Sequence, residues 1–165
     1  MKTKDLDALF HDTLKDIYYA ERKLLKAIPK MARAAQSEEL RTAFQTHKTE
    51  TEGQKERLDR VFEIIGKRAA GKTCPAIDGI LEEGDEIMEE FKDSPALDAG
   101  LIAAAMAVEH YEIARYTALC GWAEKLGHLD AVTLLQETLA EETSAAEALA
   151  GLARTGLRSM QLAAE

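Results

Sequence analysis

Apolar side chains recur every three or four residues along most of the chain, which is the pattern of helices that each bury one side. The first such segment runs from about Thr3 to Ala35. Pro29 lies inside it and is expected to kink this helix or to end its first section, because proline cannot donate the backbone hydrogen bond. The apolar stripe of this segment consists of Leu6, Phe10, Leu14, Ile17, Leu24, Leu25, Ile28 and Met31.

A second long helix is predicted from Ser37 to about Ile65. The serine hydroxyl is a good acceptor for the free N–H groups of a first helical turn. Gly66 suits the position just after the last turn, where the backbone is often left-handed. A basic, glycine-containing connector then leads to Pro75, which can open a shorter acidic helix over residues 76–91.

A serine–proline pair at residues 94–95 precedes a third long helix, predicted over residues 96–126 and ended by Gly127. The fourth long helix is predicted over residues 129–153, and the tail beyond Gly156 is expected to fray.

The lengths of the connections predict how these helices are arranged. Tight joints near Gln36 and near residues 127–128 make two antiparallel hairpins, and a segment of roughly 30 residues between the hairpins can carry the chain along the bundle. The prediction is an all-α, ferritin-like four-helix bundle with a long crossover that carries an extra short helix. Residues 1–165 are expected to form a single ferritin-like domain.

Composition supports a helical protein and excludes two classes of partner. Hydrophobic residues make up 46% of the 165 residues, and the net charge of −9 leaves no basic stripe for nucleic acid. No apolar run approaches the roughly 20 residues that span a bilayer, and the first residues lack the apolar centre of a secretory signal. Cys74 and Cys120 form no recognisable motif. We therefore expect a cytoplasmic protein without a membrane or nucleic-acid partner.

The apolar stripes are interrupted by charged side chains. Residues of a helix turn by about 100° each, so each stripe can be searched for polar positions. Glu52 points well away from its stripe, and Glu141 falls about a quarter turn outside. The side chains on the inward sides are Glu21, His47, Glu50, Glu109, Glu112 and Glu142.

In each hairpin, the two glutamates lie at nearly the same distance from the joint. Glu21 and Glu50 lie 15 and 14 residues from the first joint, and Glu112 and Glu142 lie 15 and 14 residues from the second. At about 1.5 Å per residue, each of them is roughly 20 Å from its own turn. If the hairpins are in register, the carboxylates converge at the middle of the bundle.

Burial of so many carboxylates requires compensation. One uncompensated carboxylate costs several kcal/mol, and five would exceed the ~5–15 kcal/mol stability of a typical domain. Few cations are near: His47 is close, and Arg57 lies two turns from Glu50. Protonation or water could relieve part of the charge, and a polar core bridged by water is the plain alternative. A pair of metal ions would relieve more, and oxygen-rich sites suit iron or manganese.

Four segments make the sequence similar to the YciF/YciE family of ferritin-like bacterial proteins. They are DIYYAERKLLKAIPKMARAA, AFQTHKTETEGQKERLDRVFE, LIAAAMAVEHYEIARYTALCGWAEKLG and AVTLLQETLAEET, and the similarity covers roughly residues 4–153. The resemblance implies a ferritin-like bundle with a crossover helix, a homodimer, a stress-associated role and a metal site related to that of rubrerythrin.

The rubrerythrin pattern takes one glutamate from the first helix and Glu-x-x-Glu from the third, which Glu21 and residues 109–112 match. It takes Glu-x-x-His from the second and fourth helices. There the glutamates match, but Gly53 and Ala145 stand at the histidine positions. His47, one turn before the glutamate of the second helix, can substitute on one side only.

This pattern is compatible with two metal-dependent functions and with a purely structural role. The favoured one is a metal-binding stress-response protein; the others are a di-iron oxidoreductase or peroxidase of rubrerythrin type, and a structural bundle with a vestigial site. His47 is equally suited to ligate metal or to orient Glu50. Gln54 is expected beside a ligand, Tyr18 can contact the site, and Tyr116 is expected in the core.

The predicted crossover helix carries more apolar residues than a short helix needs, and part of this surface could pair with a second chain. We therefore predict a homodimer. The residues concerned are Ile80, Leu81, Ile87, Met88 and Phe91.

Overall fold

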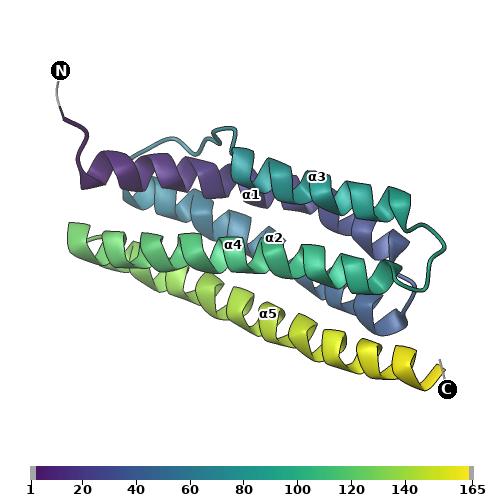
Figure 1. Cartoon of the computed structure of the whole chain (residues 1–165). Coiled ribbons are helices and arrows are strands. Elements are labelled where there is room, and N and C mark those ends of the chain that lie inside the picture. The colour runs from purple at the N-terminus through teal and green to yellow at the C-terminus, as the bar shows by residue number, and fades with distance from the viewer. Residues whose placement is uncertain (1–2, 164–165) are drawn as a thin grey trace.

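The computed structural model describes residues 3–163, which contain five α-helices and no β-strand. Four long helices form an antiparallel bundle, and the short α3 lies in the connection between α2 and α4 (Figure 1). This confirms the predicted ferritin-like bundle with its extra crossover helix. The helices are α1 (Leu6–Ala34), α2 (Glu38–Ile64), α3 (Pro75–Glu90), α4 (Leu97–Leu126) and α5 (Leu129–Ala163).

Side-chain caps fix the joints of the bundle. Ser37 caps α2 by accepting the Leu40 N–H at 3.3 Å. The Asp98 carboxylate in the first turn of α4 accepts the backbone N–H groups of Gln36 and Ser37, each at 2.7 Å. The turn of the first hairpin is thereby attached to the start of the second. Gly127 ends α4 with φ of 80°, a left-handed conformation that glycine adopts without strain.

Two predictions about helix ends need correction. Pro29 was expected to kink the first helix or to end its first section, and the second alternative is wrong because α1 continues through Pro29 to Ala34. α5 continues through Gly156 to Ala163 instead of ending near Ala153. A single glycine inside a helix costs about 1 kcal/mol, which does not end the helix when no alternative cap follows it.

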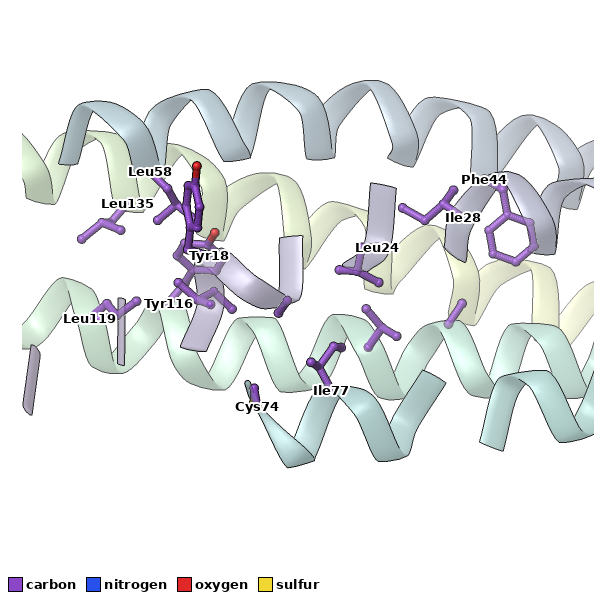
Figure 2. Close-up of a cluster of buried hydrophobic side chains, with 14 of the residues drawn as sticks. Tyr18, Leu24, Ile28, Phe44, Leu58, Cys74, Ile77, Tyr116, Leu119 and Leu135 are labelled. Carbon is purple, nitrogen blue, oxygen red and sulfur yellow. The ribbon is translucent and has the colours of Figure 1, made fainter. Parts of the chain in front are cut away.

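The apolar stripes of the four long helices meet along the bundle axis. Figure 2 shows Leu58, Tyr116 and Leu135 gathered at one end of the cluster and Ile28 and Phe44 at the other. All of these side chains are buried. In α1, Glu21 lies between Tyr18, which belongs to the first group, and Ile28, which belongs to the second, so the apolar core is interrupted near its middle by a polar position.

The crossover helix α3 packs on α1 and α4. Ile77 is completely buried, and a Cβ at Gly100 of α4 would come within 2.7 Å of the Ile87 side chain, so any larger residue there would force one of the two helices or the Ile87 side chain to shift. Tyr19 of α1 donates its hydroxyl to Asp78 at 2.8 Å. The apolar side of α3 is thus largely covered within its own chain, and Phe91 remains 43% exposed.

Among the described residues, none of the helices combines the length and the apolar character that a membrane span requires.

Candidate metal centre

Each of the four long helices contributes at least one ionisable side chain to the interrupted region of the core. Glu21, Glu112 and Glu142 are completely buried, Glu109 is 2% exposed, and His47 is 8% exposed. They come from α1, α4, α5, α4 and α2, respectively. The predicted convergence of the carboxylates is therefore observed for these residues.

Four of the side chains are close enough to share one ion. His47, Glu109, Glu112 and Glu142 each place a ligand atom within 4.8 Å of the other three. Within this group, His47 Nε2 lies 3.1 Å from Glu109 Oε1. Glu50 lies at the edge: its Oε2 is 3.8 Å from His47 Nδ1, and its side chain is 32% exposed.

Glu21 is held by a tyrosine that sequence reasoning assigned to the core. The Tyr116 hydroxyl donates to Glu21 Oε1 at 2.5 Å. Tyr18, for which the sequence left contact with the site open, donates to Asp59 at 2.9 Å. Tyr116 lies one turn after Glu112 on the same face of α4, and this spacing was the signal available in the sequence.

Burial dominates the electrostatics of the cluster. It raises the pKa of Glu21 to about 8, with the charge of Glu142 adding to the shift and the Tyr116 hydrogen bond opposing it. Burial, together with Glu142, raises the pKa of Glu109 to about 11. Burial and the neighbouring glutamates raise the pKa of Glu112 well above its ordinary value. Without a cation, these carboxyl groups therefore retain protons at neutral pH.

Several buried atoms of the cluster lack a hydrogen-bond partner among residues 3–163. They include both carboxyl oxygens of Glu112 and of Glu142 and both ring nitrogens of His47. Buried polar groups without partners cost roughly 1–3 kcal/mol each. A metal ion would satisfy these atoms together, and carboxylate with imidazole is a donor set that iron and manganese accept. The residues present thus fit the metal that the family resemblance implies.

Arg57 pairs outside the cluster and does not neutralise it. Arg57 donates to Thr138 Oγ1 at 2.8 Å and pairs with Glu141 and with Glu137, the latter at 3.1 Å. Gln54 donates to Glu141 at 3.0 Å, so it supports this peripheral pair rather than a residue of the cluster, contrary to expectation. Glu141 is therefore outside the buried group, as its helical phase predicted.

The two positions at which the rubrerythrin pattern has histidine differ in their surroundings. A Cβ at Gly53 would lie 3.8 Å from Arg57 Nη2, so the guanidinium approaches that position. Ala145 instead lines an apolar cavity that also reaches His47 and Glu109. His47 is consequently the one imidazole within the described cluster.

Removal of the Tyr116 hydroxyl is expected to destabilise the metal-free protein. Tyr116→Phe leaves Glu21 without its observed donor, and such a buried acceptor costs about 1–3 kcal/mol. Urea unfolding in the presence of chelator measures this loss. Tyr18→Phe is the matched control: it removes a hydroxyl that bonds to the partly exposed Asp59, and its effect should be under about 1 kcal/mol. Equal losses in the two variants would contradict the assigned contact.

Comparison with known proteins identifies close relatives. The chain is 44% identical over 140 residues to Protein YciF of Escherichia coli K12, covering 84% of each. It matches the crystal structure of the E. coli stress protein YciF with a TM-score of 0.90 at 41% identity, covering 94% of this chain and 99% of that one.

Two further structures extend the comparison. YcfI of Rhodopseudomonas palustris, to which a structural role has been provisionally assigned, matches with a TM-score of 0.86 at 46% identity, covering 88% of this chain and 93% of that one. A Xanthomonas campestris protein matches with a TM-score of 0.74 at 20% identity over 95% and 96% of the two chains, which shows a common fold. Residues 5–161 match the family described as "Domain of unknown function (DUF892)". The chain therefore belongs to the DUF892 family and is a YciF-like, ferritin-like helical bundle.

Proposed function

We propose that this chain is a metal-binding protein of the bacterial stress response that holds iron or manganese in its buried carboxylate cluster. The observation that carries the proposal is the convergence of His47, Glu109, Glu112 and Glu142, which are buried and within 4.8 Å of one another. The unpartnered oxygens of Glu112 and Glu142 support it, because a cation would compensate their burial.

Each side chain has a proposed role at the centre. Glu109 and Glu112 lie one turn apart on α4 and present two carboxylates to the ion, and Glu142 adds a third from α5. His47 is the nitrogen ligand. Glu21 and Glu50 supply further carboxylates, which with the others are enough for a second ion, as in the rubrerythrin arrangement.

Elemental analysis of protein purified without chelator tests the proposal directly. We expect at least about one iron or manganese ion per chain, because ligand sets of this kind bind such ions. The Glu109→Gln/Glu112→Gln variant should contain none. Absence of a stoichiometric metal from both proteins would leave the cluster a water-filled vestige in a structural bundle.

We propose that the protein binds metal without catalysing a redox reaction. The histidines of both Glu-x-x-His motifs are replaced, by Gly53 and Ala145, so the site lacks two imidazoles of the rubrerythrin pattern. A steady-state hydrogen peroxide assay on iron-loaded protein separates the possibilities. Sustained turnover that disappears in Glu109→Ala would instead assign a di-iron peroxidase.

The proposed role in the stress response is supported by the similarity of this chain to YciF. YciF is described as a stress protein, and the identity of 44% extends over most of both chains. We propose the same general role for this chain, acting as one cytoplasmic domain.

We also propose a homodimer, and sedimentation tests it. Equilibrium sedimentation at tens of micromolar should give twice the 18.2 kDa chain mass. Because most of the apolar side of α3 is covered within the chain, we propose that the exposed Phe91, which directly follows α3, contacts the second chain. A single species at the chain mass under these conditions would refute the dimer.

A further inference from the structure

A cavity of about 460 Å³ opens between α2 and α5, and residues of α1 and α4 form its floor. Its volume lies within the roughly 300–1,000 Å³ that small-molecule pockets occupy. Most of its wall is apolar, with Leu24, Ile28, Phe44, Leu149 and Leu152 among the larger side chains.

Small side chains on α5 create the space. Ala145 and Ala148 line the cavity one turn apart, at positions where larger side chains would project into it. Ala148 is exposed to solvent through the opening, whereas Leu149 beside it is buried. The cavity is therefore accessible from one side and closed by the bundle core on the other.

The ionisable side chains that line the cavity are three glutamates and one histidine. The lining contains Glu39, Glu50, Glu109 and His47, and it contains no lysine or arginine. Glu109 is 2% exposed and His47 is 8% exposed, and neither imidazole nitrogen has a hydrogen-bond partner among the described residues. The deep polar end of an otherwise apolar cavity is thus acidic and offers unpaired buried atoms.

We propose that this cavity binds a small amphiphilic amine. Its apolar body lies against the leucines and Phe44, and its primary ammonium group lies between Glu50, Glu109 and His47. The Glu50 carboxylate at the edge of the cavity attracts a cationic head and repels an anionic one. A purely apolar molecule would bury the imidazole and Glu109 without giving them partners, which costs binding free energy. The ammonium head has three N–H donors and can bond with two or three of these side chains.

The amine site overlaps the proposed metal centre at His47 and Glu109, but it does not require a metal ion. An ammonium head and a metal ion would occupy the same space beside these two side chains, so they are expected to compete. Binding of the amine is therefore measured on chelator-treated full-length protein. Failure of the amine to bind leaves the metal analysis unaffected, and failure to find metal leaves the amine titration unaffected.

Calorimetric titration with three probes of equal chain length tests the proposal. Octylamine should bind at least about tenfold more tightly than octanoate, and octan-1-ol should lie between them, since one favourable charge contact of about 1.4 kcal/mol corresponds to a factor of ten. Ala148→Phe fills the cavity and should weaken octylamine by at least about tenfold. Ala140→Phe is the matched control, because Ala140 is an exposed alanine of the same helix outside the cavity.

A second variant locates the head group. Glu50→Gln should weaken octylamine several-fold while leaving octan-1-ol unchanged, since it removes charge at the cavity but hardly changes its shape. Circular dichroism melting confirms that each variant is folded. Octanoate binding as tightly as octylamine, or an unchanged octylamine affinity in folded Ala148→Phe, would overturn the proposal. So would the absence of binding by every probe, or a loss of self-association in Ala148→Phe, which would make this face an interface between two copies of the chain.

Discussion

Addition of manganese(II) to chelator-stripped protein near neutral pH is expected to raise the melting temperature by about 5–10 °C. A ligand that binds only the native state stabilises it by RT ln(1 + [L]/Kd), or about 2.7 kcal/mol at a hundredfold excess over Kd. For a chain of this length, each kcal/mol shifts the melting temperature by about 2–4 °C. Iron(II) under anaerobic conditions should act in the same direction.

The structure indicates which variants should lose this response. Glu109→Gln/Glu112→Gln removes two of the four grouped ligands and should abolish the shift. Without metal the same variant is expected to be more stable than the native sequence near neutral pH, because each of these glutamates must take up a proton to be buried, whereas an amide is already uncharged. Glu52→Gln is the control: Glu52 is exposed and pairs with Lys48 at 3.0 Å, so the response should remain. Melting curves that ignore both metals would contradict the proposed centre.

The helical periodicity of the sequence was sufficient to predict the bundle, since each long helix has one apolar stripe, interrupted only at the ionisable positions of the site, and two short joints allow only antiparallel neighbours. The end of α5 was less predictable. Gly156 resembles a stop signal, but local propensity is weak beside the cooperativity of a helix that is already 27 residues long at that point. The sequence shows no stronger signal that would have placed the end at Ala163.

The sequence predicted the site from two criteria: the inward face of each helix, and the number of residues between each side chain and its hairpin joint. Glu21, Glu112 and Glu142 were placed by both criteria, and all three are completely buried. Glu50 satisfies the same criteria but lies at the edge, because a small rotation of α2 moves a long side chain toward solvent. Helical phase fixes the direction of a side chain only to within such a rotation, which depends on how all four helices pack.

Contacts between helices were the least predictable feature. Gln54 was expected beside a ligand, yet it bonds to Glu141 together with Arg57. The choice depends on α5, whose sequence lies more than 80 residues away. Likewise, Tyr116 of α4 reaches Glu21 across the bundle, whereas Tyr18, on the same helix as Glu21, bonds to Asp59 of α2.

The metal-free protein is expected to lose stability as the pH rises from about 5 to about 8. Glu21 has an ordinary pKa of 4.5, which is raised to about 8 in the native state by burial and by Glu142. Between these values the native state binds more protons than the unfolded state, so the free energy of unfolding falls with increasing pH. The slope is up to about 1.4 kcal/mol per pH unit for each such group. Glu109 and Glu112 shift in the same direction, so a total loss of several kcal/mol is expected.

Surface ion pairs do not reverse this trend. The Lys72 ammonium lowers the pKa of Asp12 from 3.8 to about 2, and this carboxylate contributes stability that is lost only as the pH falls through that range. Its effect lies below the window in which the buried glutamates act. Maximum stability of the metal-free protein is therefore expected near pH 5, on the acid side of the range usual for globular proteins.

Urea unfolding at several pH values measures the free energy of unfolding of the metal-free protein, in chelator, and of the metal-loaded protein, in manganese(II). With metal, the profile should reverse and stability should rise with pH, because binding requires the carboxylates to be deprotonated. Glu21→Gln should reduce the slope of the metal-free protein, whereas Glu52→Gln should preserve it. A metal-free stability that stays constant or rises between about pH 5 and 8 would show that the buried glutamates do not hold protons, and that some other group compensates their charge.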